Sequence, residues 1–150
     1  MKLSILDQSV AIANKCQDQV INDTLNLSIM AEELGYSRFW ISEHHNHPTI
    51  IGTAPEVLMA AIAAKTNKIR IGSAGIMLPH YSSFKVAEQF RVLNSLAPNR
   101  IDLGLGRAPG SDGRTALALN SNNREFSENF PSHVRLSLIH ISEPTRLRTI

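Results

Sequence analysis

Short apolar runs alternate along the chain with segments whose apolar residues recur every three or four positions. Four runs have the composition of buried or half-buried strands: 3–7, 39–41, 69–75 and 101–106. Helical spacing occurs in three intervening segments, which are residues 20–34, 55–64 and 83–96. Units in which a strand is followed by a helix, joined by right-handed crossovers, build a parallel sheet. The pattern therefore predicts an α/β fold with four parallel strands and flanking helices.

The predicted helices carry start and stop signals. The first has an apolar face that ends at Gly35 and comprises Val20, Thr24, Leu27, Ala31 and Leu34. Thr53 stands before Pro55 and Glu56 in the pattern of a helix start, so Thr53 is expected to cap the second helix. Ser83 is expected to cap the third helix. Residues 77–81 are expected to form a connecting loop.

Polar residues directly follow the predicted strand at 39–41. Glu43, His44, His45 and Asn46 bring a carboxylate, two imidazoles and an amide to the C-terminal end of a strand. In parallel α/β folds, that edge of the sheet is where ligands bind and chemistry occurs. A single histidine is more often a hydrogen-bonded structural residue than a catalyst. Two adjacent histidines behind a glutamate favour a functional site.

A metal site is an alternative use of these side chains, since imidazole and carboxylate groups suit zinc or iron. Its candidate ligands are Glu43, His44, His45, His47 and His80. Adjacent residues of a strand point to opposite faces, however, so His44 and His45 cannot easily share one metal ion.

Two other strand ends suit a ligand. The strand at 69–75 ends in small residues, so a flat ligand can approach the backbone at Ala74 and Gly75. Arg107 directly follows the fourth strand, and its fork of donors suits a phosphate, although it also fits a solvated surface arginine. Residues 104–110 resemble a dinucleotide-binding fingerprint, but Pro109 occupies the place of the third glycine. A Rossmann site is therefore rejected.

Composition narrows the function classes. The chain has 150 residues, of which 43% are hydrophobic and 19% charged, as in one ordinary globular domain. The net charge is +2 and no Lys/Arg stripe is present, so nucleic acid is not an expected partner. The single Cys16 cannot form an internal disulfide. The sequence lacks a signal peptide and an apolar span of about 20 residues, so we expect a cytoplasmic protein without a membrane partner.

The ordered motifs resemble those of the bacterial-luciferase-like flavin monooxygenase family over residues 3–134. They are Glu43-His44-His45-Asn46, residues 54–57, residues 71–81, residues 85–89 and residues 100–110. The resemblance implies a (β/α)8 TIM barrel, of which these four strands form the N-terminal half. It also implies reduced FMN as cofactor, dioxygen and a small organic molecule as substrates, a flavin reductase as partner, and a homodimer.

The resemblance also assigns roles to individual residues. His44 and His45 match catalytic positions, where an imidazole suits proton transfer during oxygen activation. Ala74-Gly75 matches a place where the family often has a non-proline cis peptide beneath the flavin ring. Arg107 matches a phosphate-contacting arginine. The expected cofactor-binding residues are Glu43, Ala74, Gly75, Met77, Gly106 and Arg107, and no metal ligand is expected.

Alternatives remain open at this level. A deazaflavin-dependent hydride-transfer oxidoreductase of the same superfamily shares this half of the fold. A barrel of this kind needs about 250 residues, so residues 1–134 are expected to be a partial barrel domain that is inactive by itself. Residues 135–150 have no counterpart in the family pattern, and one back-translation of residues 136–146 resembles a transposase-based sequencing adapter. That segment is expected to be a non-native, disordered tail that packs on nothing.

Overall fold

The computed structural model describes residues 1–142. Its strands are β1 (Ser4–Asp7), β2 (Arg38–Ile41), β3 (Arg70–Ser73), β4 (Ile76–Met77), β5 (Ile101–Asp102) and β6 (Leu105–Gly106). Its α-helices are α1 (Gln17–Glu33), α2 (Pro55–Lys65), α3 (Ser83–Leu96), α4 (Gly113–Leu119), α5 (Asn123–Glu128) and α6 (Phe130–Ser142), and η1 (Leu78–His80) is a 3₁₀ turn. No helix in this range combines the length and the apolar character needed to cross a bilayer.

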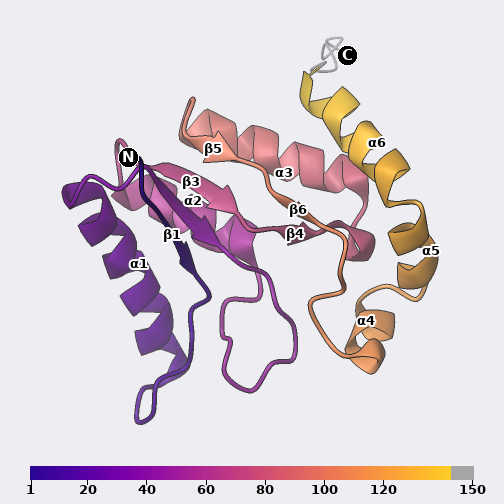
Figure 1. Cartoon of the computed structure of the whole chain (residues 1–150), viewed down its shortest axis with the longest axis horizontal. Coiled ribbons are helices and arrows are strands. Elements are labelled where there is room, and N and C mark those ends of the chain that lie inside the picture. The colour runs from indigo at the N-terminus through magenta and orange to yellow at the C-terminus, as the bar shows by residue number, and fades with distance from the viewer. Residues whose placement is uncertain (143–150) are drawn as a thin grey trace, which may run out of the picture.

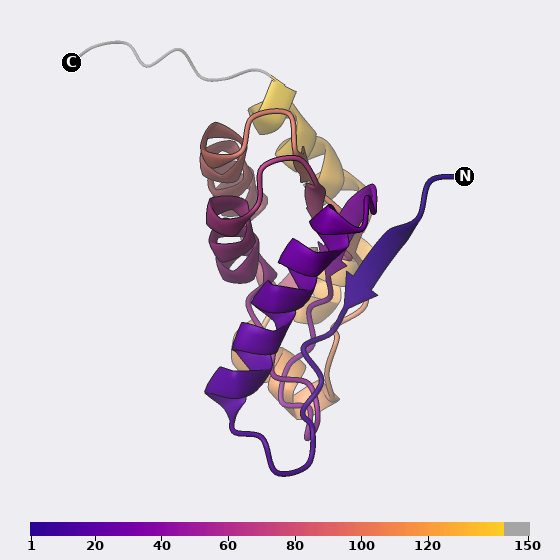
Figure 2. The ribbon, with the colours of Figure 1, turned by 90° about the vertical axis from the view of Figure 1, so that its left-hand side faces the viewer.

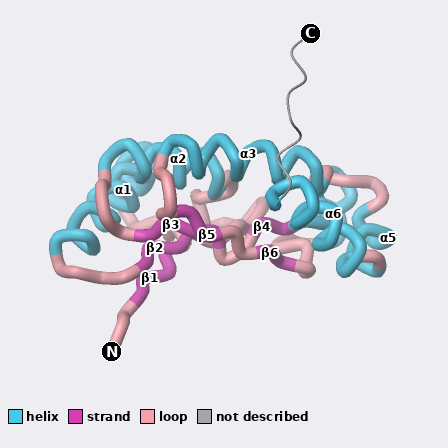
Figure 3. The backbone as a smooth tube through the Cα atoms, turned by 90° about the horizontal axis from the view of Figure 1, so that it is seen from above, coloured by secondary structure: helices cyan, strands magenta, loops and turns pink. Residues whose placement is uncertain are grey.

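Four strands form one parallel sheet in the order β1-β2-β3-β5, which confirms the predicted four-stranded parallel arrangement. Helices α1, α2 and α3 lie along one face of this sheet, and no helix of the described residues covers the opposite face (Figure 1). Views from the side and from above show the same separation into a helical layer and a sheet layer (Figures 2 and 3). The fold is thus the layered half of an α/β barrel.

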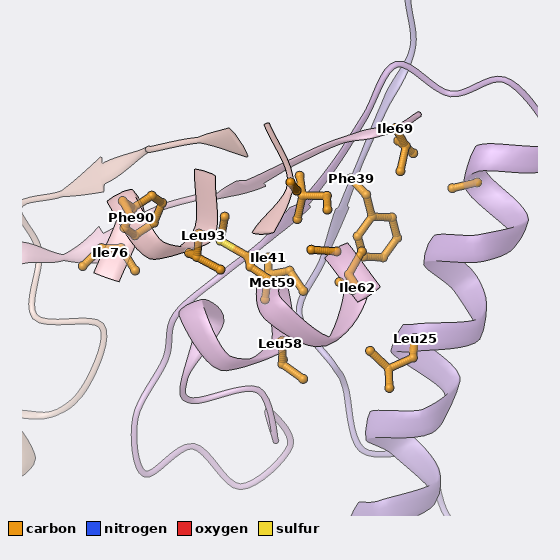
Figure 4. Close-up of a cluster of buried hydrophobic side chains, with 14 of the residues drawn as sticks. Leu25, Phe39, Ile41, Leu58, Met59, Ile62, Ile69, Ile76, Phe90 and Leu93 are labelled. Atoms are coloured by element: carbon orange, nitrogen blue, oxygen red, sulfur yellow. The ribbon is translucent and has the colours of Figure 1, made fainter. Parts of the chain in front are cut away.

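The alternation of side chains along each strand places the core between the two layers. In β2, Phe39 and Ile41 are fully buried toward the helices, whereas Arg38 and Trp40 on the other face are half-buried. Side chains from both layers meet in the core shown in Figure 4, where the labelled helical residues are Leu25, Leu58, Met59, Ile62, Phe90 and Leu93. Burying this apolar surface is what holds the helices on the sheet.

Two details of the first predicted helix are wrong. Leu27 is 36% exposed and Leu34 is 69% exposed, so neither belongs to the buried face of α1. The buried face instead includes Leu25 and Ser28, and the Ser28 hydroxyl donates a hydrogen bond to the Leu25 carbonyl at 2.7 Å. A serine whose hydroxyl is satisfied within its own helix can be buried, which an apolar pattern does not reveal.

The predicted caps of the next two helices are also wrong, each by one residue. Ala54 is the N-cap of α2 and makes no side-chain capping bond, with Pro55 beginning the helix. Ser82 caps α3 by accepting a hydrogen bond from the Lys85 backbone N–H. The hydroxyl of Ser83 is instead hydrogen bonded to His133 Nδ1 on α6, at 3.3 Å.

The predicted fourth strand at 101–106 is two strands. Ser73 Oγ donates to the Gly104 carbonyl at 2.9 Å and accepts from the Gly104 N–H at 3.1 Å. Beyond this contact the chain leaves β3, and β6 pairs in parallel with β4 in a second, two-stranded sheet. Of residues 77–81, which were expected to form a loop, Met77 lies in β4 and residues 78–80 form η1.

Helix α6 crosses the predicted boundary between domain and tail at residues 134 and 135. Ser137 is buried, and the His140 ring meets the Phe84 ring of α3 edge to face, with centroids 4.7 Å apart. The expectation that the tail packs on nothing is therefore wrong for Ser137 and His140. Residues 143–150 lie outside the described residues, and the non-native origin of the tail stays a prediction.

Candidate functional site

Three segments meet where the strands end. The Ala74 N–H donates to the Ile41 carbonyl at 2.7 Å, which places the end of β3 beside the end of β2. The His45 N–H donates to the Gly110 carbonyl at 3.0 Å, which brings the loop after β6 to the same place. The structure thus gathers the two histidines, Ala74-Gly75 and the loop that follows Gly106.

Glu43 is the centre of the hydrogen bonding in this region. Its side chain is 0% exposed, and it accepts hydrogen bonds from Tyr81 Oη at 2.7 Å and the Met77 N–H at 2.9 Å. His45 Nε2 lies 2.6 Å from the same oxygen that Tyr81 contacts. Protein groups enclose the carboxylate, so in this structure it acts on a ligand only through these neighbours.

Tyr81 is a member of the cluster that sequence reasoning assigned only to a loop. Burial, followed by the negative charge of Glu43 and the hydrogen bond to it, raises the pKa of the Tyr81 hydroxyl. Tyr81 therefore remains a protonated donor to Glu43. The only local signal was its place after Pro79-His80 within the family-like motif, and the contact itself spans 38 positions.

The two adjacent histidines have different surroundings. Glu43 and His45 contact each other across His44, which shares no hydrogen bond with either of them. A carboxylate only accepts hydrogen bonds, so His45 Nε2 carries the shared proton. His44 Nδ1 is buried, and no residue among 1–142 hydrogen bonds to it. An unpaired buried ring nitrogen at a strand end suits a group that binds a ligand.

His80 has a structural role. Its Nε2 lies 2.6 Å from the Pro109 carbonyl, which can only accept, so Nε2 is the protonated nitrogen. Its Nδ1 then accepts a hydrogen bond from the Asn123 side-chain amide, at 3.1 Å. Within residues 1–142, no group of three or more His, Cys, Asp or Glu side chains is arranged to hold a metal ion.

The Ala74-Gly75 peptide bond is cis, as the resemblance predicted. The reason for a glycine at 75 differs from the expectation, however. A Cβ at this position would lie 2.9 Å from the Gly104 carbonyl oxygen and 2.9 Å from the Leu105 carbonyl carbon. The close approach of the protein's own backbone therefore requires Gly75, before any ligand is considered.

Met77 and Gly106 pack on each other. A Cβ on Gly106 would lie 2.8 Å from Met77 Sδ, so the methionine side chain uses the space that the glycine leaves. Gly110, at a φ of 60°, leaves room for the same side chain on another side. Met77 and Gly106, which were both predicted to bind the cofactor, thus help to shape the end of the small β4-β6 sheet.

Arg107 is exposed, and its Nε donates to the Ser127 carbonyl at 3.0 Å. This bond ties the guanidinium to the end of α5. Its two terminal nitrogens make no hydrogen bond or ion pair within the described part of the chain, so they can meet an anion.

A further contact, between Asn46 and α4, was missed from the sequence. The Asn46 side-chain amide donates to Thr115 Oγ1 at 3.0 Å and contacts Asp112, the N-cap of α4. The hydrogen bonds from Thr115 hold the pKa of Asp112 at about 2. These hydrogen bonds tie the histidine loop, which is the segment 42–54 between β2 and α2, to the loop that carries Arg107.

Comparison with known proteins gives one consistent result. A family profile described as "Luciferase-like monooxygenase" matches residues 1–128. The chain is 56% identical over 110 residues to N-acetyl-S-alkylcysteine monooxygenase of Bacillus subtilis (strain 168), covering 73% of this chain and 33% of that protein. It is 44% identical over 131 residues to a luciferase-like monooxygenase of Escherichia coli (strain K12), covering 87% of this chain and 39% of the relative.

Solved structures share the fold. The crystal structure of apo-MsnO8 matches with a TM-score of 0.88 and 36% identity, over 99% of this chain and 44% of that chain. More distant matches show the fold alone. One is the oxygenating constituent of 3,6-diketocamphane monooxygenase from the CAM plasmid of Pseudomonas putida, in complex with FMN (TM-score 0.77, 22% identity, 94% of this chain and 38% of that one). Another is an F420-dependent secondary alcohol dehydrogenase (TM-score 0.73, 15% identity, 95% of this chain and 42% of that one).

Proposed function

The chain belongs to the luciferase-like monooxygenase family, and on that premise we propose that it supplies the histidine-bearing part of an FMN-dependent monooxygenase. In this proposal, reduced FMN and dioxygen oxidise a small organic molecule. The chain spans about 33–40% of the length of the first four curated relatives, so the proposed activity is that of a whole enzyme.

The observation that carries the proposal is the state of His44. Its Nδ1 is buried just after β2 and has no hydrogen-bond partner in the described part of the chain, and Ala74 is hydrogen bonded to the same strand end. An imidazole can take up or release a proton near neutral pH, which suits reactions that need proton transfer at the edge of a bound ring. No other described histidine combines this position with an unpaired buried nitrogen.

The residues present fit a flavin with a phosphate. The free terminal nitrogens of Arg107 suit a phosphate dianion, and the segment at Ala74-Gly75 presents backbone rather than long side chains. FMN, when bound, supplies the redox chemistry, and the protein supplies position and proton transfer. His44 would hold or move a proton through its ring, while Glu43, His45 and Tyr81 hold the loop beneath it.

The partners follow from the same proposal. The relative with 56% identity is named for N-acetyl-S-alkylcysteine, so thioethers of this kind are the first substrates to test. A flavin reductase would deliver reduced FMN, and the complete enzyme would be a homodimer. A deazaflavin enzyme that transfers hydride without oxygen is the alternative, because an F420-dependent dehydrogenase shares the fold.

The test uses a protein that carries this segment within a complete barrel. With chemically reduced FMN and a thioether substrate, oxygen consumption should match product formation. His44→Ala should lower turnover about 10²-fold or more and leave FMN affinity nearly unchanged, since general acid-base catalysis contributes on this scale. His47→Ala is the matched control, because His47 is exposed on the same loop and its Nδ1 contacts Thr49.

Two outcomes would overturn the assignment. Oxygen-independent reduction of F420 with an alcohol would identify the hydride-transfer alternative. Equal turnover in His44→Ala and His47→Ala would remove His44 from the chemistry.

A further inference from the structure

We propose that Glu43 is a positioning residue, which sets the direction of the His44 side chain without touching the bound molecules. The inference rests on the proposed function, because His44 is the group whose direction then matters. Sequence resemblance assigned Glu43 to the cofactor, whereas the structure encloses its carboxylate completely.

Three hydrogen bonds converge on Glu43 from three places in the chain. Oε1 receives Tyr81 Oη and His45 Nε2, and Oε2 receives the Met77 N–H. One carboxylate thus joins the histidine loop, strand β4 and the residue after η1. Within residues 1–142 no Lys or Arg forms an ion pair with it, and His45 is its one ionisable basic partner.

His44 depends on these anchors because none of residues 1–142 forms a hydrogen bond with its ring. Glu43 and His45 flank it in sequence, and the hydrogen bond between their side chains ties the two residues to each other. The His45 backbone is held as well, through its N–H to the Gly110 carbonyl at 3.0 Å. The backbone on either side of His44 is therefore fixed, and that backbone sets where the imidazole points.

A carboxylate suits this position better than an amide. All three partners are donors, and only a carboxylate offers acceptor oxygens on both of its arms. In Glu43→Gln, the NH₂ group would face a donor, either the Met77 N–H or the pair formed by Tyr81 and His45. Either the Met77 N–H loses its acceptor, or the Tyr81 hydroxyl and His45 Nε2 must both change from donors to acceptors, so the anchors rearrange although the side-chain volume is nearly unchanged.

The experiment needs no cofactor and uses the 150-residue chain. Histidine ring signals of the wild type, Glu43→Gln and Glu32→Gln are compared by NMR, with His44 assigned from His44→Gln. Glu32 is a matched control, since its carboxylate also ties a loop by accepting backbone N–H groups, from Asn67, Lys68 and Ile69. Glu43→Gln should move the His44 signals clearly, and Glu32→Gln should lower stability without moving them.

Further variants keep the inference testable if Glu43→Gln does not fold. Tyr81→Phe removes one of the three donors and should move the His44 signals in the same direction by less, and Glu43→Asp should restore them in part. In the complete enzyme, a misplaced His44 should lower kcat by up to about 10²-fold with a smaller change in KM. His44 signals that move no more in Glu43→Gln and Tyr81→Phe than in Glu32→Gln would overturn the proposal, whether or not the chain binds a flavin.

Discussion

At the scale of single residues, two buried serines at neighbouring strand ends differ in what their hydroxyls do. Ser73 is 0% exposed and makes two hydrogen bonds to the Gly104 backbone. Ser42 is 2% exposed, and its hydroxyl has no partner within the described residues. The two hydroxyls are similarly buried but contribute differently to stability, because a buried polar group stabilises the fold only when it is hydrogen bonded.

We predict that Ser73→Ala lowers the free energy of unfolding by about 1–3 kcal/mol, since the Gly104 N–H loses its acceptor. Ser42→Ala should change it by less than about 1 kcal/mol, or raise it, because no hydrogen bond is lost. Urea unfolding of the two variants measures both values. Equal losses would show that the Ser42 hydroxyl is paired in solution.

Tyr81 makes stability depend on alkaline pH. Burial and the Glu43 charge raise its pKa above the ordinary 10.0, so the folded chain keeps a proton that the unfolded chain loses as the pH rises past 10. The stabilisation is complete below pH 10 and declines above it. At neutral pH, Tyr81→Phe should cost about 1.5–3 kcal/mol, the scale of a hydrogen bond to a charged group.

The difference in the free energy of unfolding between wild type and Tyr81→Phe should therefore be smaller at about pH 11 than at about pH 8. Urea unfolding at both pH values measures it, and Tyr36→Phe, at the other tyrosine, is the control. A difference that stays constant or widens would contradict a raised Tyr81 pKa.

At the scale of elements, the Arg100 side chain connects the end of helix α2 to the start of strand β3. Its guanidinium donates to the Ala63 carbonyl in the last turn of α2 at 3.1 Å. It also donates to Thr66 Oγ1 at 3.0 Å and to the Ile69 carbonyl just before β3 at 3.3 Å. A cation at the C-terminal end of a helix also interacts favourably with the helix dipole.

Arg100→Ala should lower the free energy of unfolding by about 1–3 kcal/mol, because several carbonyl and hydroxyl acceptors lose their donor together. Arg100→Lys should recover only part of this, since an ammonium cannot reproduce the planar fork. Arg124→Ala is the control, because its exposed ion pair with Glu128 contributes at most about 0.5 kcal/mol. Chemical denaturation of all three variants makes the comparison, and equal losses in Arg100→Ala and Arg124→Ala would refute it.

Local patterns predicted the strands that start each unit, because the alternation in β2 and the apolar run of β3 are properties of adjacent residues. They did not predict that Gly104 divides the fourth strand, since the cause is Ser73, 31 positions away. The candidate site was likewise predictable only in part. The histidine pair follows from its position after β2, whereas the burial of Glu43 depends on Tyr81 and Met77 from a distant segment.

At the scale of the whole molecule, the helices cover one face of the sheet, and α6 closes the end of this layer against α3 (Figure 1). The uncovered face is polar at its centre. There the Asp102 carboxylate forms ion pairs with both Arg38 and Arg70. Burial alone would raise the pKa of Asp102, but the hydrogen bonds and charge of Arg70 hold it below its usual value.

Because α6 packs through residues beyond 135, deletion of residues 136–150 should lower the melting temperature. A loss of about 1 kcal/mol corresponds to about 2–4 °C in a chain of this size. Deletion of residues 143–150 is the control, since the described helix ends at Ser142. Calorimetry of the two shortened chains makes the measurement. Equal melting temperatures would show that residues 136–142 contribute nothing measurable to stability.

The strand order β1-β2-β3-β5 follows the order of the chain. Ladder partners such as Ser4 and Arg38, Arg38 and Arg70, or Ile71 and Ile101 are separated by similar lengths of sequence, each holding one helix. Every strand can therefore dock on the preceding one as soon as its own segment has been synthesised. Folding on the ribosome can proceed unit by unit, and the histidine loop is anchored only when β4 and Tyr81 have emerged.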